Sequence, residues 1–485
     1  MIGILIRSSL DNIEHTNLTL LAGLTFNIDR QSKISLSNQI SNLIRTFVNN
    51  GQLKQAVQLP STRILSIELS VSRSTVVNAY EQLVAEGYIH ARTGAGYRVC
   101  STQGLELPAS EPSVAINQPA PPAAHLLRAS HPDMRLFAYK KWAKHVARVC
   151  RTQTQTMLVE TSPFGNAALR QSIAEYVKQW RGIEASAEQI IITAGAGEAV
   201  NICFASLSRP GERIGLEDPG YPPILRYADS HKLKAEFLDV QAEGTALPSP
   251  KYRSKLVVLT PSHQYPLGGV MSPQRRRDFI AWAKTNNSWI IEDDYDSEFR
   301  YAGQPIPALA SFDKLQRCLY VGSFSKIFSN TLRLGYIIAP LSLVNRIEST
   351  MMRYGFKAGL MPQQALSHFM DSGDYYRHLR RVRKTYNERR KYLVSELQSS
   401  FNNYGSVQEH PAGMQLIFSL NSPLNDSQIA SLLRRQGVDI RALSGFSQRK
   451  LTHNGLVMGF CGNTLDEIAQ ALEILRQVLR QQALT

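Results

Sequence analysis

The sequence has no long hydrophobic run, and no apolar stretch approaches the ~20 residues that a helix needs to cross a bilayer. The opening segment, MIGILIRSSLDNIEHTN, has only a short apolar patch and no small-residue cleavage site, so we expect no signal peptide. The five cysteines are odd in number and lack metal-ligand spacing, which argues against a disulfide framework and a zinc site. These absences predict a cytoplasmic protein that holds no metal and does not associate with a membrane.

Acidic residues are also in deficit. The chain has 39 Asp and Glu against 54 Lys and Arg, a formal net charge of +15. Such an excess attracts polyanions, and nucleic acid is the first candidate in a cytoplasm. At 485 residues the chain is too long for one ordinary domain, so two or more are expected.

The first folded segment has the pattern of a winged helix-turn-helix. Residues 37–49 have apolar side chains at helical spacing, and Ser61 or Thr62 can cap a short second helix. Ser72 can cap a third helix, and YIHARTGAGYRV reads as a two-stranded wing. The third helix would enter the major groove of DNA. The predicted DNA-binding residues are Thr62, Arg63, Ser72, Arg73, Ser74, Thr75, Arg92 and Gly94.

Composition then suggests the domain boundaries. Residues 101–126 are rich in Pro, Ala and Ser and predict a semi-extended linker. We therefore expect an N-terminal extension over 1–29, a DNA-binding domain over 30–100, the linker, and an α/β domain over 127–485. In this last domain a basic helix over 375–393 has too many cations around its circumference for one DNA-binding stripe, so a solvated, packed helix is the better interpretation than a DNA-contacting one.

One lysine of the α/β domain stands in an unusual setting. In VGSFSKIFSNTLRLGY, Lys326 follows Ser323 and Ser325 and precedes Arg333, with an apolar run on each side. A lysine at the edge of a core is poorly solvated, which favours its neutral, nucleophilic form. Two hydroxyls and a guanidinium can hold a phosphate. These residues suit pyridoxal phosphate (PLP) bound to Lys326 as an imine.

Other stretches supply further groups for the same cofactor. Main-chain N–H groups at Ala196 and Gly197 begin a helix and can bind phosphate, and Tyr221 can stack on a pyridine ring. WIIEDDYDSEF ends an apolar strand with acids, of which Asp293 is the predicted partner of the pyridine nitrogen. Asp294 is the next residue and could be mistaken for it. Tyr295 is expected to reach the phenolic oxygen of the ring. The residues His263, Gln264 and Tyr265 are expected at the same crevice.

These motifs resemble two known families. LPSTR, VSRSTVVNAYEQLVAEGY and RTGAGYRV resemble the DNA-binding domain of the GntR family. The ordered set around SFSK, from roughly 130 to 480, resembles fold-type I aminotransferases. The two halves in this order resemble the MocR/GabR transcriptional regulators. The resemblance implies a head-to-tail homodimer that binds a double-stranded DNA operator and responds to a small-molecule effector, either PLP itself or an amine or amino acid, with vitamin B6 or amino-acid metabolism genes as targets.

The chain departs from that pattern at one position. The resembled families hold an amino-acid carboxylate with an arginine in a motif like LRLGF, whereas GLVMGF here places Val457 at that point. A carboxylate opposite valine would lie unpaired, at a cost of about 2–5 kcal/mol in binding, unless Arg441 or another cation compensates. This favours a sensing role over enzymatic turnover. The alternative interpretation is an active PLP-dependent aminotransferase that carries a DNA-binding domain.

Overall fold

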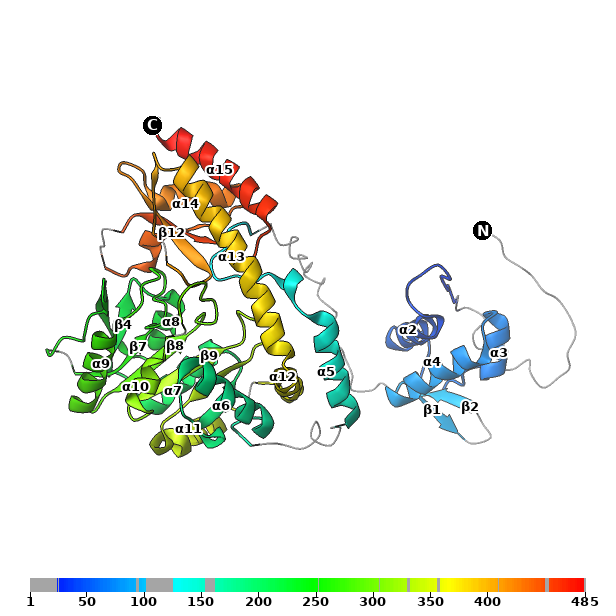
Figure 1. Ribbon diagram of the computed structural model, residues 1–485. Helices are drawn as coiled ribbons and strands as arrows, with labels where there is room; N and C mark the ends of the chain where they lie inside the picture. The colour runs from blue at the N-terminus through cyan, green and yellow to red at the C-terminus, as the bar shows by residue number, and fades with distance from the viewer. Residues whose placement is uncertain are drawn as a thin grey trace, which may run out of the picture. The chain divides into compact units, whose positions relative to one another are not determined.

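The computed structural model describes residue 24 and residues 26–92, 96–101, 125–152, 162–251, 253–304, 306–328, 332–355, 358–408, 410–449 and 453–483 (Figure 1). The chain divides into two compact units, Met1–Gln118 and Pro119–Thr485. The predicted extension and linker lie almost wholly outside the described residues, as does Gly94. No helix among the described residues is long and apolar enough to span a membrane.

Where the structure describes it, the smaller unit has three helices and a two-stranded hairpin. Its elements are α2 (Leu36–Asn49), α3 (Thr62–Glu68), α4 (Arg73–Ala85), β1 (Ile89–Arg92) and β2 (Gly96–Val99). Apolar side chains at helical spacing, such as Ile40, Ile44 and Tyr80, form its buried core. The side chain of Ser61, not Thr62, caps α3, and that of Ser72 caps α4.

The larger unit is built on an eight-stranded sheet with strand order β3-β10-β9-β8-β7-β4-β5-β6. The neighbouring pairs from β9 to β5 are parallel, whereas β10 runs antiparallel to both of its neighbours. The strands are β3 (Ile190–Thr193), β4 (Arg213–Asp218), β5 (Lys234–Gln241), β6 (Gly244–Thr245), β7 (Ser254–Leu259), β8 (Trp289–Asp294), β9 (Cys318–Ser323) and β10 (Gly335–Ile338).

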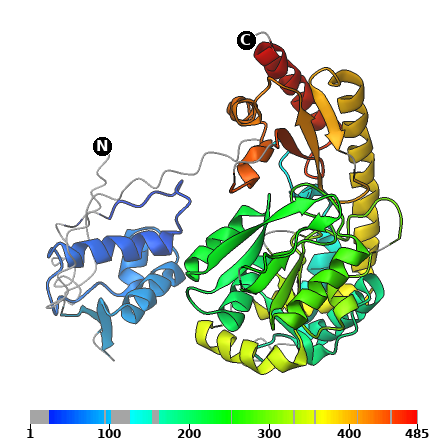
Figure 2. The same ribbon diagram turned by 90° about the vertical axis from the view of Figure 1, so that its left-hand side faces the viewer.

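Helices cover both faces of this sheet (Figure 2). Alternate residues of β3 point to two separate cores: Ile190 and Ile192 belong to one, and Ile191 belongs to the other. The covering helices are α5 (Tyr139–Thr152), α6 (Ala167–Arg181), α7 (Ala196–Leu207), α8 (Pro222–Ser230), α9 (Pro273–Thr285), α10 (Leu309–Asp313), α11 (Leu341–Tyr354) and α12 (Leu360–Asp371). A mainly parallel sheet covered on both faces leaves the carboxyl ends of its strands as the natural place for a ligand.

A smaller antiparallel sheet, of order β11-β12-β14-β13, completes the unit. Its strands are β11 (Gly405–Gln408), β12 (Gln415–Leu420), β13 (Arg441–Ala442) and β14 (Gly455–Gly459), and its helices are α13 (Asp374–Ser400), α14 (Asp426–Arg435) and α15 (Leu465–Ala483). The long helix α13 runs from this sheet down to α12, so it ties the two parts of the unit together (Figure 1).

The arginines of α13 hold the larger unit together. Arg381 and Arg383 donate to main-chain carbonyls of other segments, and Arg389 pairs with the buried Asp133 at 2.8 Å. Arg377 pairs with Asp374 of the same helix and is mostly exposed. The packed-helix interpretation of residues 375–393 therefore describes Arg381, Arg383 and Arg389 better than a DNA-binding surface does.

The pair between Arg389 and Asp133 yields a stability prediction. Both residues are buried, and Asp133 also accepts from the half-exposed Arg135 at 2.8 Å. We expect Asp133→Ala to lower the free energy of unfolding of the larger unit by about 3–5 kcal/mol, because it leaves the Arg389 guanidinium buried and unpaired. Urea unfolding followed by circular dichroism measures this loss. Arg135→Gln, a change at the exposed partner, should cost less than about 1 kcal/mol, and an equal loss in both variants would contradict the assignment.

Candidate functional site

Glycine residues allow the start of α7 to approach the end of β9. Thr193, Gly335 and Ser323 lie side by side across β3, β10 and β9. A Cβ atom at Gly335 would stand 2.8 Å from the carbonyl carbon of Gly195, the residue before α7, which is closer than real Cβ atoms come. The first N–H groups of a twelve-residue helix and the Ser323 hydroxyl therefore meet at one sheet edge, an arrangement suited to an anion.

Lys326 lies three residues beyond β9, between the buried side chains of Phe324 and Phe328. Its Nζ donates a hydrogen bond to the main-chain oxygen of Ser130, 2.8 Å away. Burial lowers the pKa of Lys326 below its ordinary value, against the opposing charges of Asp296 and Asp293. A larger neutral fraction makes this amine a better nucleophile than an exposed lysine.

Three consecutive acidic residues end β8, and they differ in their hydrogen-bond and ion-pair partners. Glu292 accepts from the main-chain N–H groups of Leu309 and Ala310, which begin α10. Asp294 pairs with Arg181 at 2.7 Å and accepts from the hydroxyls of Tyr320 and Ser297. These two carboxylates are satisfied by the fold.

Asp293 differs from both neighbours. Its Oδ1 atom is buried and has no hydrogen-bond partner among the described residues. Burial, together with the charges of Asp294 and Glu217, raises the pKa of Asp293 to about 7, although Lys326 acts in the opposite direction. A buried carboxyl that lacks a partner is incomplete without a donor, and a protonated ring nitrogen is such a donor.

Aromatic rings line the same region. Tyr221, at the start of α8, and Tyr295 both lie edge-on to Tyr265, with ring centroids 5.3 and 5.6 Å apart. Tyr221 is 45% exposed, so one ring face is free to cover a ligand. The Tyr295 hydroxyl lies 2.9 Å from His263 Nδ1, which is also 3.0 Å from the Asp296 carboxylate.

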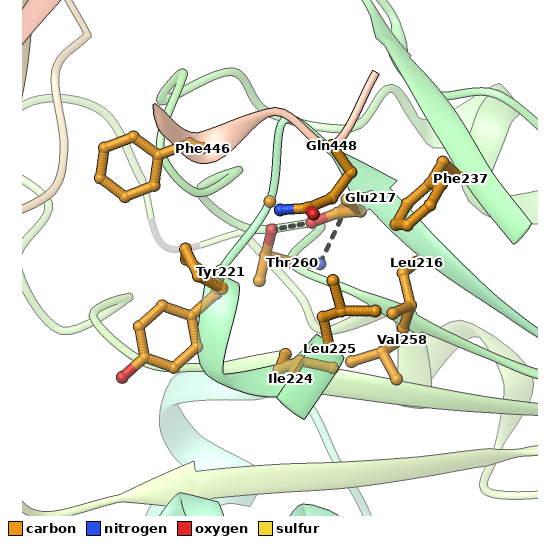
Figure 3. Close-up of a pocket in the computed structure, with 12 residues that line it drawn as sticks. Leu216, Glu217, Tyr221, Ile224, Leu225, Phe237, Val258, Thr260, Phe446 and Gln448 are labelled. Carbon is orange, nitrogen blue, oxygen red and sulfur yellow. Dashed lines mark hydrogen bonds between the residues drawn. The ribbon is translucent and has the colours of Figure 1, made fainter. Parts of the chain in front are cut away.

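A small, partly open pocket adjoins Tyr221 on the far side from its hydroxyl (Figure 3). Phe446 and Gln448 border it from the loop after β13, and Glu217 lies beneath Gln448 (Figure 3). The Glu217 carboxylate already accepts from Thr245, from both the N–H and the hydroxyl of Thr260, and from Gln264. Gln264, which the sequence places at the ligand crevice, donates its side-chain amide to this carboxylate at 3.3 Å.

Val457 is fully buried on β14. It belongs to a small apolar cluster with Ile417, Leu443, Phe446 and Tyr265, against which Tyr295 also packs. The surroundings of Val457 are therefore hydrocarbon and aromatic. A carboxylate placed there would lose its water without gaining a donor.

The remaining predicted phosphate ligands are placed as follows. The main-chain N–H of Ser325 donates to the Ser323 hydroxyl at 3.2 Å, so the two serines lie on one turn. Gly197 lies in the first turn of α7. Arg333 is exposed and has a left-handed backbone, with φ of 47°. The assignment of these residues to a phosphate stays a prediction.

The predicted DNA-contacting residues differ in their exposure to solvent. Arg63, Arg73, Ser74 and Arg92 are exposed, whereas Thr62 is buried at the first position of α3 and does not present its side chain to solvent. The sequence missed this because a helix start looks the same whether its first side chain points in or out. The Ser72 hydroxyl lies 2.8 Å from those of both Ser74 and Thr75, and it accepts from the Thr75 N–H as a helix cap.

Arg73 is the most informative of these residues to replace. It begins α4 and is exposed, and its side chain forms no hydrogen bond or ion pair within the described part of the chain. We expect Arg73→Ala to weaken promoter binding about tenfold and, if it contacts a phosphate, to reduce the slope of log affinity against log salt by about 1. Fluorescence anisotropy over a salt series measures both quantities. Arg45→Ala is the matched control, because Arg45 is already paired with Glu86 at 2.7 Å, and an equal effect there would contradict the prediction.

Some residues of the site were not predicted from the sequence. Ser130 and Gln415 are joined by a 2.6 Å hydrogen bond next to Lys326, and Asp296 holds His263. Ser130 stands almost two hundred residues before Lys326, and no local pattern links the two. Of Ser130, Gln415 and Asp296, only Asp296 could have been found from the sequence, because it directly follows Tyr295 in the acidic run.

Comparison with known proteins agrees with this geometry. Residues 130–475 match the family model described as aminotransferase class I and II, and residues 36–99 match that of bacterial regulatory proteins, gntR family. The chain is 30% identical over 475 residues to the probable rhizopine catabolism regulatory protein MocR of Rhizobium meliloti, covering 93% of this chain and 94% of that one. It is 31% identical over 457 residues to the pyridoxine biosynthesis transcriptional regulator PdxR of Corynebacterium glutamicum, covering 93% and 98%. A kynurenine aminotransferase of Pyrococcus horikoshii shares the fold, with a TM-score of 0.68, 20% identity, and coverage of 75% and 92%.

A GntR-type DNA-binding domain followed by an aminotransferase-like domain defines a transcriptional regulator whose ligand-binding part has the fold of an enzyme. The chain belongs to the MocR-type family of these regulators. The predicted fold class and the resemblance found in the sequence are confirmed, and PLP is the cofactor expected of such a domain.

Proposed function

We propose that this regulator binds PLP covalently at Lys326 and that occupancy of this site, by PLP alone or by PLP with an amine effector, controls its affinity for an operator. The observation that carries the proposal is the buried Asp293 Oδ1, which has no partner in the described residues and would pair with the pyridine nitrogen. Tyr221 would cover the ring, and Tyr295 would reach its phenolic oxygen. The phosphate would lie against Ala196, Gly197, Ser323, Ser325 and Arg333.

The hydrogen bond between Lys326 and Ser130 suggests how PLP binding at Lys326 is transmitted to the DNA-binding unit. Ser130 belongs to residues 127–133, which follow the predicted linker. This segment is fastened by hydrogen bonds from the Leu127 N–H to Asn463 and from the Gly459 N–H to the Leu127 oxygen. A lysine bonded to the cofactor can no longer donate to Ser130 as a free amine. The segment that leads to the linker would therefore lose the hydrogen bond between Lys326 and Ser130 when PLP is bound.

Vitamin B6 metabolism is the favoured setting for the regulated genes. The relative PdxR is named for pyridoxine biosynthesis and covers nearly the whole chain. Val457 also favours a ligand that brings no α-carboxylate, and PLP itself is one. An active aminotransferase is the rival, and Val457 counts against it because transamination of an amino acid needs its carboxylate held.

The homodimer is part of the same proposal. Met352, Tyr354 and Met361 lie within ten residues of one another at the end of α11 and the start of α12, and all three are exposed. Exposed large apolar side chains such as these favour association with another chain. A head-to-tail arrangement would let each DNA-binding unit respond to the partner's cofactor site.

The test uses the purified full chain and a labelled fragment of its own promoter. Titration with PLP at fixed salt should change the dissociation constant by at least about fivefold, the lower end of usual coupling between sites. An unchanged affinity at saturating PLP would contradict the proposal. Multiple turnover of amino groups between amino acids and 2-oxo acids would favour the aminotransferase instead.

A further inference from the structure

Two residues directly after β8 contact the same atom of one histidine. The Nδ1 atom of His263 lies 3.1 and 3.0 Å from the two carboxylate oxygens of Asp296 and 2.9 Å from the hydroxyl oxygen of Tyr295. The side chains of His263 and Asp296 are only 3% and 1% exposed. A carboxylate and a phenol therefore share one imidazole nitrogen, and this phenol is the group proposed to reach the phenolic oxygen of PLP.

The two distances to Asp296 indicate where the hydrogen of His263 lies. They are nearly equal, which is the geometry of one N–H group shared by both oxygens of an ionised carboxylate. An ionised carboxylate is only an acceptor, so both oxygens can approach Nδ1 this closely when Nδ1 carries a hydrogen. Without that hydrogen the buried carboxylate would face a nitrogen lone pair and lack a donor. Asp296 therefore fixes the tautomer of His263.

The tautomer of His263 in turn orients the hydroxyl of Tyr295. An Nδ1 atom that carries a hydrogen has no lone pair to accept one, so the Tyr295 oxygen accepts from His263 and its own hydrogen points elsewhere. Burial, followed by the charges of Asp296 and Tyr265, raises the pKa of Tyr295 well above its ordinary value, so the hydroxyl keeps this hydrogen. The Tyr295 O–H group is thus available to donate to a ligand.

Other titratable groups surround Tyr295 and His263. Those that act on Tyr295 besides Asp296 are two acids and one phenol: Asp293, Glu217 and Tyr265. His410 lies beside His263, since a Cβ atom at Gly268 would meet both rings. Burial and the charge of His263 lower the pKa of His410, so His410 stays uncharged at neutral pH. Within the described residues, Asp296 is the only carboxylate that pairs with His263.

We propose that His263, fixed by Asp296, is a positioning residue of the cofactor site that directs the Tyr295 hydroxyl to the phenolic oxygen of PLP. The inference rests on the proposed function, in which PLP is bound to Lys326. In PLP bound through a lysine, the linking nitrogen shares its proton with the phenolic oxygen of the ring. A hydroxyl that donates to this oxygen competes with that proton, and it lowers the pH at which the nitrogen releases it. Asp296 and His263 thereby set the protonation state of bound PLP without touching it.

The test follows the absorbance of the PLP-loaded full chain over a pH series, because this absorbance changes when the linking nitrogen loses its proton. Asp296→Asn keeps the shape of the side chain but offers an amide in place of a carboxylate. The Nδ1 atom of His263 can then give up its hydrogen and accept the hydrogen of Tyr295, which withdraws that donor from the cofactor. The same substitution also removes a charge that acts on Lys326, so it is made both in the wild type and in Tyr295→Phe.

The expected result is a difference between these two backgrounds. Loss of the charge acts equally in both, whereas loss of the Tyr295 hydrogen bond acts only where Tyr295 is present. The midpoint shift caused by Asp296→Asn should therefore be higher in the protein with Tyr295 than in Tyr295→Phe by at least about one pH unit, the effect of one charge-assisted hydrogen bond. Equal shifts in the two backgrounds would overturn the inference and leave the proposed function standing.

Two matched variants should keep the wild-type midpoint to within about half a pH unit. His263→Asn is the conservative one, because its amide nitrogen takes the place of Nδ1 and can donate to Asp296. Asp313→Asn changes a buried carboxylate of α10 that accepts from the main-chain N–H groups of Arg317 and Cys318. A shift in Asp313→Asn as large as that in Asp296→Asn would contradict the assignment.

A second measurement does not depend on the cofactor. Nitrogen NMR of the PLP-free full chain with labelled histidine, with His263→Asn to assign the signal, reports which ring nitrogen of His263 carries hydrogen. The Nδ1 atom should carry it, and a bare Nδ1 would overturn the inference even if Asp296→Asn does not retain PLP. A wild-type protein with no PLP absorbance after loading would overturn the proposed function, and this inference with it.

Discussion

Replacing Lys326 with alanine is expected to abolish retention of PLP. Lys326 supplies the amine of the proposed site, and burial lowers its pKa toward the neutral, reactive form. After incubation with PLP and desalting, the wild-type chain should show cofactor absorbance and keep about one PLP per chain after borohydride reduction. Lys326→Ala should show neither, because no bond to the cofactor can form or be reduced.

Lys284→Ala is the control for this experiment. Lys284 is exposed on α9 and belongs to no part of the proposed site. It should retain PLP as the wild type does. Labelling that persists in Lys326→Ala, or disappears equally in Lys284→Ala, would place the covalent bond elsewhere in the chain.

Replacing Asp293 with asparagine should separate cofactor affinity from stability. Asparagine keeps the shape of the side chain but cannot carry the charge that pairs with a protonated ring nitrogen, so PLP affinity should fall by about 2–5 kcal/mol. In the PLP-free protein, by contrast, the same substitution should raise the free energy of unfolding. The pKa of Asp293 is raised to about 7, so between about pH 4 and pH 7 the folded protein keeps a proton that the unfolded chain has released. The fold thus loses stability from this group as the pH rises through that window.

Asp293→Asn removes this penalty. The PLP-free variant should be more stable than the wild type at pH 8, by on the order of 1–4 kcal/mol, and the difference should vanish toward pH 4. Urea unfolding at both pH values measures it. Asp294→Asn is the matched control, because it breaks the buried pair with Arg181 and should destabilise the protein. A stability gain at Asp294 and a loss at Asp293 would show that the two roles are exchanged.

Much of the fold could be predicted from local patterns. Apolar spacing located the helices of the DNA-binding unit, and hydroxyl residues located the starts of α3 and α4 to within one position. The run of apolar residues before Asp293 and before Ser323 predicted two buried strands, and parallel strands bring their carboxyl ends to one edge. The sequence therefore predicts that Lys326 and Asp293 lie at one crevice.

Other features depend on contacts between distant segments. Asp293 and Asp294 are both buried at the end of β8, so alternation along the strand does not decide between them, whereas their partners do. Arg381, Arg383 and Arg389 of α13 could not be told from surface charges in the sequence, because the carbonyls and the carboxylate that they bind lie in distant segments. The position of Arg441 beside Val457 follows from strand register, which is set by the packing of the whole small sheet.

The proposed function depends most on one effect: PLP bound at Lys326 changes the affinity of the regulator for its promoter. The most direct measurement locks the site: the wild-type protein is loaded with PLP, reduced with borohydride and desalted, and its promoter dissociation constant is compared with that of protein reduced without PLP. The account predicts that the locked protein binds the promoter as PLP-saturated protein does and no longer responds to added PLP. A locked protein that binds DNA as the PLP-free protein does would contradict it.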